Sequence, residues 1–143
     1  MKTLLTGLII FICTLQFQYS SSIIIEHVGE IDKPFCTIKI TDEKSDTLQE
    51  GKALHYKGIV DSKVFSKLRD ITSFTQGNTK ADKMDFGTFK LTLYEKGMLS
   101  HQYFLDRKKA IRLLDDFIHK LKQENSNEEL ISYLEINKKR INY

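Results

Sequence analysis

The sequence has few cysteines and few prolines, and the scarcity of cysteine limits what the protein can be. Of its 143 residues, two are cysteine and one is proline. Cys13 lies in an apolar N-terminal stretch that we expect to be removed, which leaves Cys36 alone and excludes an internal disulfide. Because Cys36 alternates with Ile38 and Ile40 along one apolar face, we expect its thiol to be buried and unreactive.

An excess of charge of one sign is also missing. The full chain has 22 basic and 19 acidic residues. Removal of the N-terminal stretch takes away Lys2, so the remaining net charge is 21 − 19 = +2. This balance is too weak to predict nucleic-acid binding. With 41% hydrophobic and 29% charged residues, the composition is that of one ordinary globular domain and excludes a disordered chain.

Sequence motifs for metal, phosphate or nucleophile chemistry are absent. No two of the four histidines stand three or four residues apart, as zinc ligands on one helix do. Asp46 occupies the position, five residues before Gly51, where a phosphate-binding loop needs its first glycine. No nucleophile elbow is present either. We therefore expect neither a metal nor a cofactor.

The N-terminus has the layout of a secretory signal peptide. Lys2 is followed by an uninterrupted, mostly apolar run and then by a more polar stretch that ends at Ser22. The run is too short to span a bilayer comfortably, so we expect no transmembrane span in the mature chain. Small side chains at Ser20 and Ser22 favour cleavage after Ser22. The chain then consists of a leader, residues 1–22, and a single domain, residues 23–143.

Two alternatives to a cleaved leader remain. The segment could be a first helix or strand of the fold, although its apolar run has no visible packing partner. Acylation of Cys13 would make the protein a lipoprotein, but Ile12 stands where lipoprotein processing needs a small side chain. We expect an exported protein, secreted or periplasmic, with lipid anchoring through Cys13 as the lesser alternative.

The clearest secondary structure is a hairpin that runs into a helix. Alternate residues of its first strand are apolar, as in a half-buried strand: Phe89, Leu91 and Leu93. We predict a three-residue loop over residues 95–97, in which Gly97 takes the left-handed conformation that closes such a loop. This loop pairs Leu93 with Leu99. The next inward pair is Leu91 with His101, so all four residues lie on the apolar face.

The remaining elements complete an α+β domain. We expect strands over residues 23–28 and 35–41, and an ambiguous segment, residues 53–60, could form a short further strand broken at Gly58. Three helices follow capping residues: Asp61, Asp106 and Ser126, the last with Glu129 in a capping box. The order strand, strand, helix, strand, strand, helix, helix predicts an antiparallel sheet of about four strands. The helices pack on one face of this sheet, and its polar face is left open.

Two histidines and the lone thiol form the first candidate site. The predicted register puts His101 on the apolar face, and His27 shares a face with Ile23 and Ile25. If the first strand lies beside the hairpin, the two imidazoles could converge near Cys36. A thiol beside an imidazole is a nucleophile with its base, and also a soft metal site. A core histidine bonded to a backbone carbonyl is the more common outcome for such residues.

A cluster of four cations is the second candidate site: Arg107, Lys108, Lys109 and Arg112. These residues occupy the first turns of the helix after the hairpin, where positive charge opposes the helix macrodipole. A helix N-terminus attracts anions, so the cluster could hold a phosphate, a sulfate or an acidic partner surface. Asp106 nearby, and the freedom of exposed side chains to extend into solvent, argue against such a site.

Two classes of function are consistent with these features. The first is an exported, non-enzymatic binding or protein-interaction module, which contacts a protein or an anionic ligand through the polar sheet face and the loops 42–52 and 75–85. The second is a small extracytoplasmic hydrolase or thiol enzyme that uses His101, His27 or Cys36. The absence of catalytic spacings favours the binding module. A pocket around His101 with a carboxylate in reach would reverse that preference.

Overall fold

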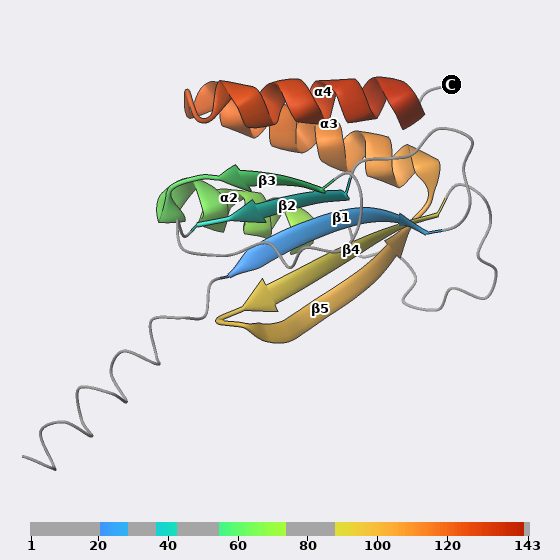
Figure 1. The fold of residues 1–143 in the computed structure, drawn as a ribbon, viewed down its shortest axis with the longest axis horizontal. Helices are drawn as coiled ribbons and strands as arrows, with labels where there is room; N and C mark the ends of the chain where they lie inside the picture. The colour runs from blue at the N-terminus through green and yellow to red at the C-terminus, as the bar shows by residue number, and fades with distance from the viewer. Residues whose placement is uncertain (1–20, 29–36, 43–54, 74–87, 142–143) are drawn as a thin grey trace, which may run out of the picture.

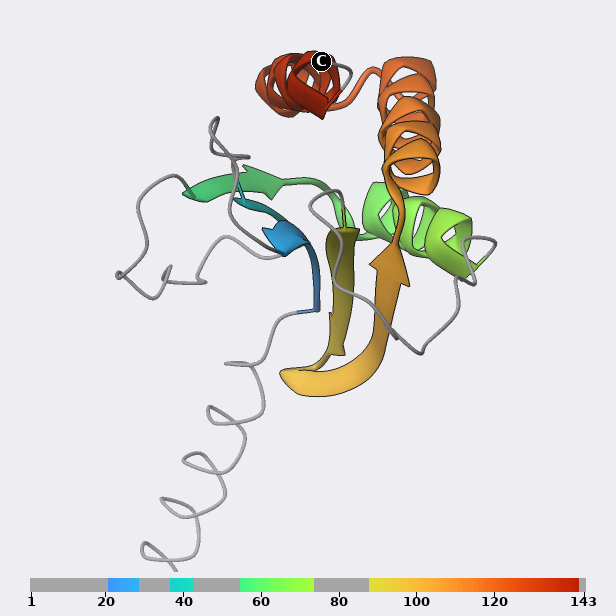
Figure 2. The same ribbon diagram turned by 90° about the vertical axis from the view of Figure 1, so that its right-hand side faces the viewer.

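In the part of the chain that the structure describes, five strands form one sheet and three helices cover one of its faces (Figures 1 and 2). The structure is a computed structural model and describes residues 21–28, 37–42, 55–73 and 88–141. The strands are β1 (Ser22–Val28), β2 (Thr37–Thr41), β3 (His55–Ile59), β4 (Thr88–Glu95) and β5 (Met98–Leu105). The helices are α2 (Ser62–Ser73), α3 (Arg107–Gln123) and α4 (Glu128–Ile141). The strand order is β3-β2-β1-β4-β5, and α3 contacts both other helices.

The sheet is mixed rather than wholly antiparallel. β1 pairs antiparallel with β2 and with β4, and β4 pairs antiparallel with β5. The expected α+β class with helices on one face is confirmed, but β3 adds an edge strand parallel to β2. Thirteen residues separate Thr41 from His55, and that length of chain is sufficient for a crossover between parallel neighbours.

The turn of the β4–β5 hairpin has two residues, not the predicted three. Lys96 and Gly97 have positive φ angles of 49° and 78°. Two successive positive φ angles give a turn whose twist matches that of the flanking strands. The left-handed conformation expected for Gly97 is therefore confirmed, and Lys96 shares it.

The register of this hairpin contains a bulge that the sequence did not reveal. Tyr94 pairs with Leu99, whereas Leu93 pairs with His101, so Ser100 is the extra residue on β5. The predicted pairs are wrong by two residues. His101 and Tyr103 of β5 nevertheless lie on the same side of the sheet as Leu91 and Leu93, as predicted. The two-residue turn alone would put them on the other side, and the bulge reverses that change. Leu99 was expected to point inward but is 59% exposed.

The covered face of the sheet carries the hydrophobic core. Eight apolar strand residues on this face are at most 6% exposed: Ile23, Ile25, Ile38, Ile40, Phe89, Leu91, Leu93 and Leu105. Each helix adds an apolar stripe, which includes Val64, Phe65 and Leu68 of α2, Leu113, Leu114 and Phe117 of α3, and Leu130 and Leu134 of α4. Full burial of one such side chain contributes about 1.5–3 kcal/mol. The alternation in the strands therefore decides which face receives the helices.

Aspartate caps fix where the first two helices begin. Asp61 accepts a hydrogen bond from the Val64 N–H at 2.9 Å. Asp106 accepts one from the Lys109 N–H at 2.8 Å. Each carboxylate satisfies a backbone donor that has no partner within the helix, so both predicted caps are confirmed.

The last helix is fixed to the edge strand β3. Its cap is Asn127, whose Oδ1 accepts from the Leu130 N–H at 3.0 Å, one residue later than the predicted cap at Ser126. The Asn127 side chain also donates to the Ile59 carbonyl at 2.9 Å. A Cβ added to Gly58 would lie 2.7 Å from Leu130 Cδ1, so the absence of a side chain at Gly58 lets α4 approach the strand.

The start of β1 overlaps the predicted leader. Ser22, after which cleavage was expected, pairs with both Thr41 and Tyr94 and is 4% exposed. Residues 1–20 lie outside the described residues. No helix among the described residues is long and apolar enough to cross a membrane.

Candidate functional site

The sheet face turned away from the helices, which we name the open face, collects the polar strand residues. Alternation along each strand and the pairing between strands determine its members. One row crosses all five strands and consists of Lys57, Lys39, Ile24, Thr92 and Gln102. None of the three described helices covers this face (Figure 2).

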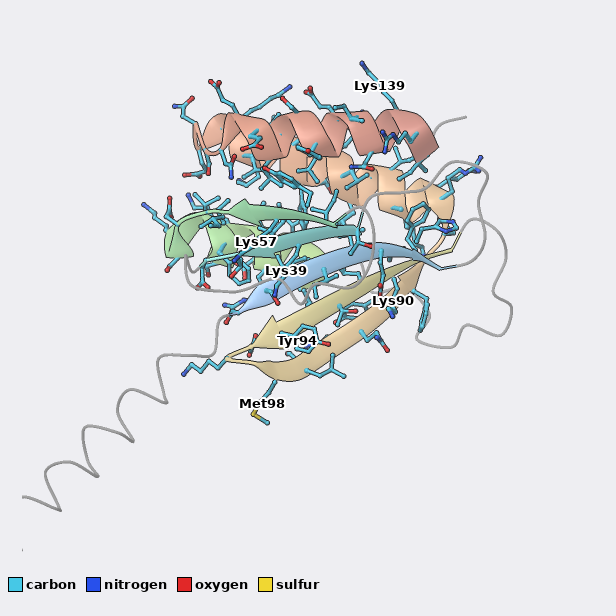
Figure 3. The ribbon with its side chains drawn as sticks, viewed as in Figure 1. Lys39, Lys57, Lys90, Tyr94, Met98 and Lys139 are labelled. Carbon is cyan, nitrogen blue, oxygen red and sulfur yellow. The ribbon has the colours of Figure 1, made fainter. Side chains whose placement is uncertain are left out.

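Lysines give the open face its charge. Lys39 and Lys57 stand directly opposite each other on the parallel strands β2 and β3 (Figure 3). Lys90 on β4 forms an ion pair with Glu26 on β1. Three lysines and one glutamate among the described strand residues give this face a charge of 3 − 1 = +2. Two ammonium groups on neighbouring strands can both donate to one bound anion.

The open face is not uniformly exposed to water. Three of its small polar side chains are at most 4% exposed: Ser22, Thr41 and Thr92. Thr92 lies between Lys90 and Tyr94 on its own strand and has Ile24 and Gln102 as cross-strand neighbours. These longer side chains shield the Thr92 side chain from solvent. The partly exposed surface available to a partner therefore includes Lys39, Lys57, Lys90 and Tyr94.

The two candidate histidines do not converge. β1 lies beside β4, as the candidate site required. His27 pairs with Phe89, however, whereas His101 pairs with Leu93, four residues farther along β4. Four residues along the strand and two strand spacings across it separate them by roughly 16 Å. The predicted meeting of the imidazoles is therefore wrong, and Cys36 lies outside the described residues.

The contacts of each histidine also differ from those of a catalytic base. The His27 ring meets Phe89 edge-on, with centroids 4.9 Å apart. His101 is exposed, stacks on Tyr103 at 5.8 Å and has Ser100 Oγ 2.8 Å from its Nδ1. No carboxylate of the described residues contacts the His101 ring. Within the described part of the chain, this serine–histidine contact on an edge strand therefore lacks the third group that orients a catalytic base.

The cation cluster lies where it was predicted, at the start of α3. All four of its side chains are exposed: Arg107, Lys108, Lys109 and Arg112. Asp106 already accepts the Lys109 N–H, so a carboxylate of the chain itself occupies part of the helix N-terminus. Successive helical side chains point about 100° apart, so residues 107–109 do not converge on one anion. Lys39 and Lys57 of the open face, by contrast, project from the same side of neighbouring strands, where both can reach one anion.

A raised tyrosine pKa marks the packing of α4. Burial, with Glu129 and Tyr133 nearby, raises the pKa of Tyr56 to about 12. The Tyr56 ring stacks on that of Tyr133 with centroids 3.7 Å apart. The phenol stays neutral near pH 7, so this pair contributes packing between β3 and α4 rather than acid–base chemistry.

The position of the lysine pair could not be read from the sequence. The predicted apolar face of Ile38 and Ile40 leaves Lys39 on the polar side of its strand, but Lys57 lies in the segment that remained ambiguous. Only the parallel register of β2 and β3 puts them side by side. The predicted contact loops 42–52 and 75–85 lie outside the described residues, apart from Asp42.

Comparison with protein families, with curated proteins and with solved structures finds no match for this chain. Among the described residues, no group of three or more His, Cys, Asp and Glu side chains is placed to hold a metal ion. The case for a function therefore rests on the geometry of the described surfaces.

Proposed function

We propose that the protein is an exported, non-enzymatic binding module whose open face takes the acidic surface of a protein partner. The observation that carries the proposal is the register of β2 and β3, which sets Lys39 against Lys57 on a face that no described helix covers. Ammonium groups on neighbouring strands can both donate to one carboxylate of a partner.

The rest of the face suits an acidic partner. Lysine ammonium groups make charge-assisted hydrogen bonds with carboxylates, which are about twice as strong as neutral ones. Glu26 of β1 already pairs with Lys90 on β4, so the excess positive charge lies on β2 and β3, while Tyr94 offers an aromatic surface with a polar end. Complementary charge of this kind increases association rates and discriminates between partners.

The alternative, a small hydrolase or thiol enzyme, has less support. Its specific arrangement needed His27 and His101 close together, and the strand register separates them. His101 has a serine and a tyrosine as neighbours, and no carboxylate among the described residues is placed to orient it. We therefore assign no catalytic residue.

Binding of the full chain to poly-L-glutamate, a model acidic polypeptide, tests the proposal. The double variant Lys39→Glu/Lys57→Glu should bind at least tenfold more weakly, which corresponds to about 1.4 kcal/mol. The matched control is Lys108→Glu/Arg112→Glu, which changes the net charge equally but lies on α3. Added salt should weaken binding of the unmodified protein, because exposed charges are screened.

The two variants give distinct answers. A loss confined to the open-face variant supports the proposal. A loss confined to the α3 variant would move the anion site to the cation cluster. Equal affinities for all three proteins would mean that the open face does not recognise acidic polypeptides.

Export belongs to the proposal and rests on the N-terminal layout of Lys2 followed by an apolar run. N-terminal sequencing of the protein from the envelope or the medium checks it. The same measurement distinguishes a start at Ser21, which keeps β1 whole, from a start at Ile23, which removes the first pair of that strand. Intact Met1 in a soluble cytoplasmic fraction would contradict export.

A further inference from the structure

The outer edge of β5 pairs with no described strand. β5 is the last strand in the sheet order, and among the described strands it bonds only to β4. Figure 1 shows β5 along the outside of the molecule, at the opposite end of the fold from α4. The outer side of such a strand presents backbone N–H and C=O groups, which pair best with another extended backbone. The chemistry of this edge therefore favours a strand as its ligand.

Alternation along the hairpin identifies which residues present these groups. Residues that flank a two-residue turn exchange backbone bonds, so Glu95 bonds toward β5 and, by alternation along the regular strand β4, Leu91 does as well. The partner of Leu91 on β5 is Tyr103. Gln102 and Phe104, on either side of Tyr103, therefore direct their backbone N–H and C=O groups outward.

The two edges of the sheet differ in how they are protected from further pairing. The β3 edge has five residues, one of them Lys57, and its Ile59 carbonyl already accepts a hydrogen bond from the Asn127 side chain at 2.9 Å. β5 has eight residues, none of which is charged or proline. Its bulge at Ser100 lies near the turn, and residues 101–105 beyond the bulge pair regularly with β4. Charged side chains, proline and covering elements normally protect edge strands, so of the two described edges β5 is the less protected.

We propose that β5 pairs antiparallel with β5 of a second copy of the chain. A two-fold axis at Tyr103 places the Tyr103 residues of the two copies opposite each other. Gln102 and Phe104 then lie opposite Phe104 and Gln102 of the other copy, so the outward backbone groups of each copy bond to those of the other. His101 lies opposite Leu105 in the same register. Near neutral pH no pair joins like charges, and the two tyrosines add an aromatic cross-strand contact.

The composition of β5 favours a second copy over a charged partner strand. Residues 101–105 carry no acidic or basic side chain that would attract a strand of opposite charge, whereas pairing of this edge with itself brings no like charges together. The two-fold contact uses β5 of both copies and leaves the β3 edges outermost, so the assembly closes at a dimer. Because the contact is small, we expect a reversible dimer rather than an obligate one. This inference does not depend on the function proposed for the open face.

A charge swap at Gln102 tests this inference. Gln102 is exposed, and in the proposed register the Gln102 side chains of the two copies are diagonal neighbours on one face of the sheet. Sedimentation equilibrium of the full chain measures the dissociation constant of the dimer. The variants Gln102→Lys and Gln102→Glu are measured alone and then mixed. The matched control is Gln123→Lys, the same change at an exposed position of α3. All these proteins keep the same N-terminal segment, so differences between them do not come from that segment.

We expect the unmodified protein and the Gln123→Lys variant to dimerise equally. Each Gln102 variant alone should have a dissociation constant about fivefold higher, because like charges then face each other across the axis, and an equimolar mixture of the two should recover the dimer. Their circular dichroism spectra should be unchanged, because Gln102 is exposed. An unmodified protein that stays monomeric would overturn the inference and leave the β5 edge to a strand of another protein. A dimer that is insensitive to both Gln102 variants, or a mixture that does not recover it, would also overturn the inference, because the contact would then lie elsewhere.

Discussion

The two faces of the sheet are made from the same five strands but differ in what they contain. The covered face is apolar and packs against three helices, with strand residues such as Ile23 and Leu91 fully buried. The open face carries Lys39, Lys57 and Lys90 and is covered by none of the described helices. Successive side chains of a strand point to opposite sides, so one alternating sequence produces both surfaces. Stability is expected to come from the first face and recognition from the second.

Burial alone does not distinguish the two faces. Thr92 is 4% exposed although it lies on the open face, and Leu91 beside it is 0% exposed on the covered face. The difference is in what surrounds them. Leu91 belongs to a continuous apolar core, whereas longer polar and aromatic neighbours shade Thr92. Neighbouring residues of equal burial should therefore contribute unequally to stability.

The largest effect is expected from the substitution Leu91→Ala. It removes a fully buried side chain from the core and leaves a cavity among residues of β1, β4 and the helices, which should cost about 2–5 kcal/mol. The matched control is Thr92→Ala on the other face, where we expect a loss below about 1 kcal/mol. Urea denaturation of both variants measures the difference.

Equal losses for the two variants would remove the distinction between the faces. The open face would then be as tightly packed as the core. A stable Thr92→Ala variant with reduced partner binding would instead strengthen the assignment of recognition to this face, because folding and binding would respond to different residues.

A smaller effect is expected at the edge of the covered face, for Gly58→Val. A Cβ at this position would lie 2.7 Å from a methyl carbon of Leu130, which is itself fully buried and has little room to move. Overpacking of this kind costs about 1–3 kcal/mol. The control is Lys57→Val on the adjacent open-face position, where a change within about 0.5 kcal/mol is expected. Thermal melts that show equal stability for the two variants would contradict close packing of α4 on β3.

Local signals in the sequence predicted most of the fold. Apolar alternation in β4 predicted its buried face, and Asp61 and Asp106 predicted two helix starts, because a cap depends on residues only three positions apart. The turn and register of the hairpin were predicted less well. A bulge at Ser100 changes the pairing without changing the pattern of apolar residues, so periodicity could not reveal it.

For the candidate sites, local sequence patterns predicted even less than they did for the hairpin register. The exposure of the cations at the start of α3 follows from helical periodicity and was predictable. The pairing of Lys39 with Lys57 depends on a parallel crossover between strands, and the distance between His27 and His101 depends on the register across β4. Such relations join residues far apart in sequence, and local patterns carry no information about them.

The smallest effect concerns an ion pair in the helix layer, between Lys67 of α2 and Glu124, the residue that follows α3. A hydrogen bond from Lys67, together with the charges of Lys67, Lys120 and Lys63, lowers the pKa of Glu124 from its usual value of 4.5. The folded state therefore favours the ionised carboxylate. Its contribution to stability is present above the unfolded-state pKa and is lost as the pH falls through the lower, folded-state pKa.

The variant Glu124→Gln should remove this part of the acid dependence. Its stability relative to the unmodified protein should be reduced near pH 7, and the deficit should shrink as the pH falls below 4.5, as urea denaturation across this range would show. Because both side chains are partly exposed, the change should be small beside that of Leu91→Ala. Lys67→Met should act on the same interaction, so combining the two substitutions should cost less than the sum of the single ones. Additive losses would show that the ion pair between α2 and α3 does not contribute in solution, which would leave apolar packing as the main connection between these helices.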